Sequence, residues 1–106
     1  MKRRVVPSSG NVFADLRIPR PDQYLAKAEL AARILKIVRA QGLPQAATAR
    51  ILGISQPKVS ALLNGRLDGF SSDRLFRFLN CLGCDVRITI SRPHAQAPGR
   101  LKILAG

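Results

Sequence analysis

Apolar positions between residues 45 and 64 repeat at helical spacing in two short halves. In the first half, Ala49 and Leu52 share one helical face. In the second, Val59, Leu62 and Leu63 follow the i, i+3, i+4 spacing of a buried stripe. The pattern therefore predicts two short amphipathic helices that pack against a common core.

The residues between these halves are of the types that end one helix and begin another. Gly53 can adopt the left-handed conformation of a helix C-terminal cap. Ser55 can cap the following helix, and Pro57 suits its first turn, where an amide has no intrahelical partner. Two short helices joined by a tight glycine turn predict a helix-turn-helix, whose second helix can enter a major groove of DNA.

The polar positions of the second helix carry groups that can read base edges. Gln56 can make a bidentate contact to adenine, and Lys58 can reach guanine or a phosphate. Ser60 and Asn64 are expected on the same outward face. The predicted DNA-binding set is Gln45, Ser55, Gln56, Pro57, Lys58, Ser60, Asn64 and Arg66. Arg66 and, outside this set, Arg50 are the weaker phosphate candidates. The alternative is an ordinary helical hairpin with a polar outer face.

Further helices are predicted on both sides of this pair. The first covers about residues 21–41, ends at Gly42 and would close the core as a third helix. The last, of about ten residues, begins after a cap at Ser71 or Ser72 and ends at Gly83.

A single convincing strand is predicted over residues 85–91. There Val86, Ile88 and Ile90 alternate with polar residues, as in a half-buried strand. A strand needs a hydrogen-bonding neighbour, and residues 101–104 are only a weak candidate. We therefore expect pairing through these three side chains with a second copy, giving a two-fold homodimer. The other possibility is an edge offered to a different protein.

Much of the chain resembles the Xre/lambda-repressor-like helix-turn-helix family, and most closely its HigA-like antitoxins. The resembling segments are NVFADL at residues 11–16, LPQAATARILGISQPKVSALLNGRL at 43–67 and GFSSDRLFRFLNCLGCDVRITI at 69–90. The resemblance implies a mainly α bundle of four to five helices with one C-terminal strand. It also implies an antitoxin that neutralises a RelE/HigB-like toxin and represses its own operon, while a stand-alone or prophage regulator is the alternative.

The chain departs from the family pattern at the start of the first short helix. Members usually have Thr at the position of Pro44 and Glu at the position of Ala47. This chain therefore lacks the capping box of that helix. Because Pro44 still pre-sets a helical backbone angle, we expect a weakened helix start rather than a lost helix.

Composition and charge narrow the choice of partner. A length of 106 residues allows one domain. The 18 Lys and Arg against 6 Asp and Glu give a net charge of +12. This charge favours a polyanion as the partner, such as a palindromic double-stranded DNA operator. We expect an arm at 1–20, the DNA-binding domain at 21–91 and a flexible basic tail at 92–106. No segment has the pattern of a membrane span or secretory signal, so we expect no membrane partner. We expect a cytoplasmic protein that is nucleoid-associated when it is bound to DNA.

The chain offers no convincing chemistry for catalysis. Its acidic residues are scattered and its single histidine, His94, lies in the predicted tail, so we expect no enzyme and no cofactor. Cys81 and Cys84 form a C-x-x-C pair, but a structural zinc site needs four ligands and one pair supplies two. We expect reduced, partly buried thiols and no metal. A protein-interaction module that uses the strand edge remains the rival of a different class.

Overall fold

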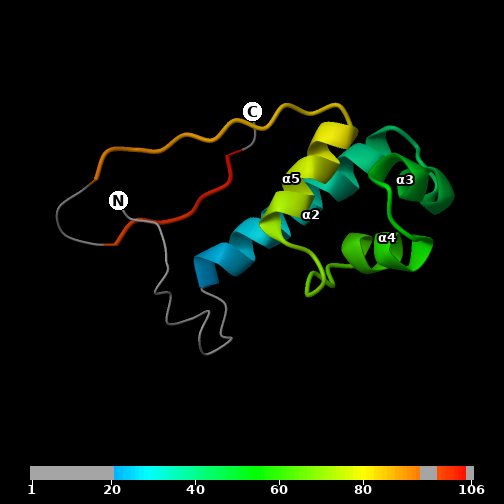
Figure 1. The fold of residues 1–106 in the computed structure, drawn as a ribbon, viewed down its shortest axis with the longest axis horizontal. Helices are drawn as coiled ribbons and strands as arrows, with labels where there is room; N and C mark the ends of the chain where they lie inside the picture. Colours follow the sequence, from blue (N-terminus) through cyan, green and yellow to red (C-terminus); the bar gives the residue numbers. More distant parts are fainter. Residues whose placement is uncertain (1–20, 94–97, 105–106) are drawn as a thin grey trace.

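The computed structural model describes residues 21–93 and 98–104. Four helices pack together in these ranges: α2 (Pro21–Ala40), α3 (Gln45–Leu52), α4 (Gln56–Leu63) and α5 (Ser72–Cys81). Figure 1 shows the long helix α2 with α5 beside it, while α3 and α4 form one end of the bundle. The mainly α fold and its helix count are confirmed. The predicted arm at residues 1–20 lies outside the described residues.

Helix α2 supplies the long side of the core. Asp22 lies in its first turn and Arg39 in its last, as the helix dipole favours. It ends before Gly42, which has a φ of 64°, and the Leu43 amide then donates to the Val38 carbonyl. The helix is therefore closed by the glycine that the sequence predicts.

One apolar core joins all four helices. Ile34 from α2, Leu62 from α4 and Leu75 from α5 are almost completely buried. The rings of Phe70 and Phe78 meet edge to face at 5.9 Å between centroids. The buried cluster is Leu30, Ala31, Ile34, Val38, Leu52, Leu62, Leu67, Phe70, Leu75, Phe78, Leu79 and Leu82. This core fixes how the short helices α3 and α4 stand on α2 and α5.

The chain continues from α5 in an extended conformation (Figure 1), but residues 85–91 form no strand within the single chain. Val86 packs on the core, whereas Ile88 is 73% and Ile90 90% exposed. The prediction of a half-buried strand is thus not met in a single chain. The physical reason is that alternation alone supplies no hydrogen-bonding neighbour. The dimer pairing stays a prediction.

Part of the predicted tail returns to the helical body. The Leu101 amide donates to Asp22 Oδ2 at 3.1 Å, and Ile103 is half-buried against the core. The segment around residues 101–103 therefore contacts the helical body. None of the described helices is long and apolar enough to cross a membrane.

Candidate nucleic-acid interface

Helix α3 begins at Gln45 without a side-chain cap. Pro44 occupies the N-cap position in an extended conformation and accepts no capping bond through its side chain. The completely buried hydroxyl of Thr48 donates to the Pro44 carbonyl at 3.0 Å, which ties the first turn to Pro44 but supplies no acceptor for the free amides. The amides of residues 45–47 precede the first helical bond, which runs from the Thr48 amide to the Pro44 carbonyl, so α3 itself offers them no acceptor. The helix start is formed without the capping box, as predicted.

The turn between α3 and α4 is built as the sequence predicts. Gly53 has a φ of 71°, and its amide donates to the Ala49 carbonyl at 2.8 Å. Ile54 then turns back onto the core. The Ser55 hydroxyl accepts the Lys58 amide at 3.4 Å and caps α4, with Pro57 in the first turn. These contacts fix the angle between the two short helices.

Helix α4 presents one face inward and the opposite face to solvent. Val59 is 0% and Leu62 1% exposed. Gln56, Pro57 and Lys58 are exposed. Its N-terminal turn therefore carries an amide and a cation that nothing in the described chain shields.

Asn64 has a role that sequence reasoning missed. Its side-chain nitrogen donates to the Ser60 carbonyl at 2.8 Å and lies 3.4 Å from the Ser60 hydroxyl. Asn64 is exposed, but this amide nitrogen binds the end of its own helix, while Ser60 is half-buried. The two residues stand together at the C-terminal end of α4, away from Gln56. The i, i+4 spacing of Ser60 and Asn64 is the signal that could have predicted the bond.

The remaining predicted contacts surround α4. Gln45 and Ser55 are exposed at the starts of α3 and α4, and Arg50 is exposed on α3. Arg66 is exposed in the loop after α4, and its amide donates to the Ala61 carbonyl at 2.9 Å. Gln45, Ser55, Gln56, Lys58 and Arg66 are thus all solvent-accessible on one helix pair and its loops.

The charge of this part of the chain is of one sign. Residues 30–67 contain six Lys and Arg and no Asp or Glu. Neither α3 nor α4 has an acidic residue in its first turn, so the positive end of each helix dipole is not neutralised there. Helix N-termini with free amides and nearby cations are favourable sites for phosphate groups. The region is therefore suited to a polyanion.

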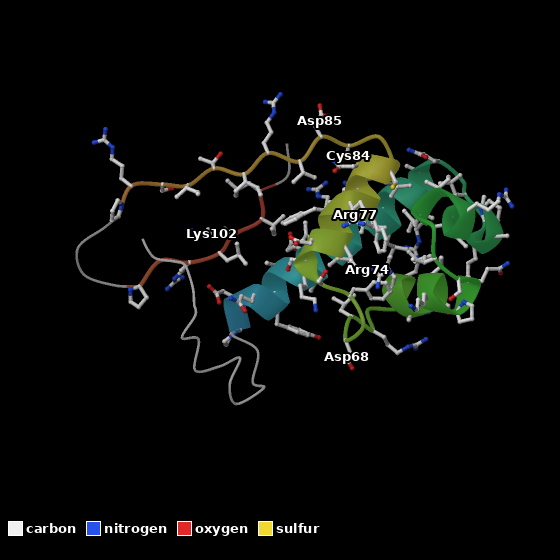
Figure 2. The ribbon with its side chains drawn as sticks, viewed as in Figure 1. Asp68, Arg74, Arg77, Cys84, Asp85 and Lys102 are labelled. Atoms are coloured by element: carbon white, nitrogen blue, oxygen red, sulfur yellow. The ribbon has the colours of Figure 1, made fainter. Side chains whose placement is uncertain are left out.

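The two cysteines lie outside this surface. Cys81 is exposed at the end of α5, and Cys84 is half-buried against the core, both as free thiols. Figure 2 labels Cys84 beside the end of α5, at the beginning of the extended segment. Among the described residues, no three His, Cys, Asp or Glu side chains gather as metal ligands would.

Comparison with known proteins identifies the fold family. A family model described as a helix-turn-helix domain matches residues 12–91. A solved structure described as a "Putative XRE Family Transcriptional Regulator" is 42% identical, with a TM-score of 0.76, and the alignment covers 83% of this chain and 100% of that chain. This chain belongs to the XRE-type helix-turn-helix family. No curated protein matches it.

Membership of the XRE-type family agrees with the geometry of the helix pair. The matched region spans all four described helices and the extended segment that follows α5. In this XRE-type chain, α3 and α4 are the helix-turn-helix pair, and α4 is the second helix, with an exposed N-terminal turn. The Xre part of the predicted resemblance is therefore confirmed.

Proposed function

We propose that this protein is a sequence-specific DNA-binding regulator that represses transcription by placing α4 in the major groove of its operator. The observation that carries the proposal is the exposed first turn of α4, with Gln56 and Lys58 outward and Val59 inward. An α-helix with its side chains is about 10–12 Å across, and the major groove is about 12 Å wide. Gln56 would read adenine, and Lys58 a guanine or a phosphate.

The phosphate contacts would come from the surroundings of α4. The amides at the start of α3 and the exposed side chains of Gln45, Arg50 and Arg66 are suited to the DNA backbone. Residues 30–67 contain no acidic residue, although the exposed Asp68 follows two positions after Arg66. The affinity should therefore fall steeply with salt, because each phosphate contact releases counterions.

A binding assay with the DNA upstream of the protein's own coding sequence tests the proposal. The double variant Gln56→Ala/Lys58→Ala should remain folded and lose its preference for that fragment over scrambled DNA. The control Gln41→Ala/Arg77→Ala removes the same kinds of group from exposed positions outside α3 and α4. The control should keep the preference. Undiminished selectivity in the first variant would exclude α4 as the reading helix.

The same proposal includes a homodimer that pairs through Val86, Ile88 and Ile90. Six of the seven exposed large apolar side chains of the described residues lie on α2 or in the extended segments, and the seventh is Ile51 on α3. On α2 they are Tyr24 and Leu25, and in the extended segments they are Ile88, Ile90, Leu101 and Leu104. Pairing of residues 85–91 with a second copy would cover Ile88 and Ile90. It would also leave both α4 helices free to occupy half-sites about 34 Å apart on a palindromic operator.

The oligomeric state tests the dimer. Ile88→Asp should give a folded monomer by analytical ultracentrifugation, with weak binding to the full operator. Thr89→Asp is the matched control, because it adds the same charge at the neighbouring position, on the opposite side of an extended segment. It should disturb the dimer less. A dimer that survives Ile88→Asp would place the interface elsewhere.

We further propose that the regulator is the antitoxin of a toxin–antitoxin module and neutralises a RelE/HigB-like toxin. The resemblance to HigA-like proteins supports this role. Such toxins are commonly basic, and a chain of net charge +12 would repel one unless the contact is largely apolar. The exposed Tyr24 and Leu25 on α2 offer such an apolar contact. A stand-alone regulator without a toxin is the alternative.

Co-expression with the product of an adjacent small reading frame tests the antitoxin role. The regulator should relieve growth arrest caused by that product and co-purify with it. Tyr24→Ser/Leu25→Ser should lose the relief, whereas Ile51→Ser, which alters an exposed apolar side chain on α3, should keep it. An adjacent product that is harmless, or arrest that the regulator does not relieve, would favour the stand-alone regulator. If instead the protein binds a partner through residues 85–91 and shows no DNA selectivity, it is an interaction module.

A further inference from the structure

The loop between α4 and α5 contains Arg66 and is fixed on both sides of that residue. Before it, Gly65 has a φ of 77° and donates to the Leu62 carbonyl at 3.2 Å. The Arg66 amide itself donates to the Ala61 carbonyl. After it, Leu67 is buried in the core. The backbone of Arg66 therefore has little freedom although its side chain is exposed.

Lys27, which lies on α2 and is distant in the sequence, binds the same loop. Its Nζ donates to the Leu67 carbonyl at 3.2 Å, across 40 positions of sequence. The Phe70 amide donates to the same carbonyl at 3.0 Å. Lys27 is half-buried, so its charge is directed into the protein rather than toward a ligand in solvent.

Arg74 from α5 binds the far end of the loop. Its Nη1 donates to the Gly69 carbonyl at 3.3 Å. Its guanidinium carbon lies 5.3 Å from the centroid of the Phe70 ring and 5.5 Å from that of Phe78. A planar cation over two aromatic rings is held by cation–π attraction as well as by the hydrogen bond. Figure 2 shows Arg74 on the part of α5 that faces the loop with Asp68, while Arg77 is further along the helix.

We infer that Lys27 and Arg74 are positioning residues that fix the loop of residues 65–69 and so hold Arg66 against the DNA backbone. This inference rests on the proposed DNA binding. Both cations would be counted as phosphate ligands from charge alone, yet both donate to loop carbonyls. Their contribution to affinity therefore passes through Arg66 and disappears when Arg66 is absent.

The test measures the slope of log affinity against log salt for the full-length protein on its operator. Arg66→Ala should lower the steepness by about 0.9 for each copy bound, the value for one lost phosphate contact. Arg74→Leu should lower it by a similar amount, and Arg66→Ala/Arg74→Leu by no more than Arg66→Ala alone. If the slope for the double variant falls by the value of two phosphate contacts, Arg74 binds phosphate directly and the inference is overturned.

Arg74→Lys separates positioning from charge. Lysine keeps the positive charge but has no planar group to lie over Phe70 and no fork to reach Gly69 in the same geometry. It should therefore behave like Arg74→Leu. Retention of wild-type affinity by Arg74→Lys would overturn the inference. Arg77→Leu is the control, because it removes one positive charge from an exposed position on the same helix. In its presence, the effects of Arg66→Ala and Arg74→Leu on the slope should still be non-additive.

Hydrogen exchange in the absence of DNA gives a second measurement. Lys27→Met and Arg74→Lys should each speed exchange of the hydrogen-bonded Arg66 and Phe70 amides more than that of the core amides of α2. Lys36→Met, an exposed position on α2, should not. Unchanged loop exchange in both variants would overturn the inference even if Arg74→Leu fails to fold. If Arg66→Ala lowers affinity and these variants do not, the positioning role alone fails. If the wild type shows no selective binding, the proposed function fails with it.

Discussion

The α3–α4 end and the C-terminal extended segments differ in how they are stabilised. At the α3–α4 end, the Gly53 amide donates to the Ala49 carbonyl and the Arg66 amide to the Ala61 carbonyl. The Ser55 hydroxyl accepts the Lys58 amide. In the extended segments, the described contacts are few, chiefly the Leu101 amide on Asp22 and the apolar anchors Val86 and Ile103. The α3–α4 end is stabilised within the single chain and exposes polar groups. The extended segments expose apolar side chains that gain stability only when something covers them.

The largest expected difference between the two ends is in the free energy of unfolding. Leu62→Ala removes an almost completely buried side chain and should cost about 2–5 kcal/mol. Ile90→Ala alters a side chain that is 90% exposed and should change monomer stability by less than about 0.5 kcal/mol. Urea unfolding at a concentration where the protein is monomeric measures both. A large cost for Ile90→Ala in the monomer would mean that the extended segment is part of the core.

A glycine at each end gives a smaller contrast. Gly53 has a φ of 71° and nothing near its missing Cβ, so Gly53→Ala should cost about 1–2 kcal/mol through the backbone conformation alone. Gly99, in the extended segment, also has open space but no positive φ. Gly99→Ala should be close to neutral in thermal unfolding. Equal losses from the two variants would show that the turn conformation at Gly53 is not what stabilises α3 and α4.

The smallest effect is expected at the start of α3, and it has opposite signs for stability and binding. Pro44→Thr/Ala47→Glu restores a capping box and should stabilise the fold by about 0.5–1 kcal/mol. The added carboxylate also places a negative charge beside the amides of residues 45–47, which have no acceptor within α3. DNA affinity should therefore fall at low salt. Increased affinity in this variant would mean that the start of α3 does not approach phosphates.

The helices and their ends could be predicted because their signals are local. The sequence places a glycine after α2, α3 and α5, and serine caps at Ser55 and Ser71, where the structure has them. Each signal acts within one turn of the backbone, so neighbouring residues are enough to identify it. The exposed first turn of α4 followed from the same periodicity, whereas Ser60, which was expected to face outward, is half-buried.

The features that could not be predicted depend on distant residues. Lys27 meets the Leu67 carbonyl across 40 positions, and no periodic pattern along α2 distinguishes it from the exposed Lys36. The contact of Leu101 with Asp22 likewise joins the two ends of the described chain. The strand over residues 85–91 was predicted from alternation, which reports a preference but cannot supply a hydrogen-bonding neighbour.

The absence of acidic residues between residues 30 and 67 has a consequence for the folding equilibrium itself. Like charges crowded on one end repel one another, and this repulsion weakens the compact state in dilute salt. A polyanion that binds only the folded form adds a stabilisation that grows with its concentration relative to its dissociation constant. Heparin or sulfate should therefore raise the melting temperature of the protein. An operator that binds this end of the molecule would stabilise its folded state in the same way.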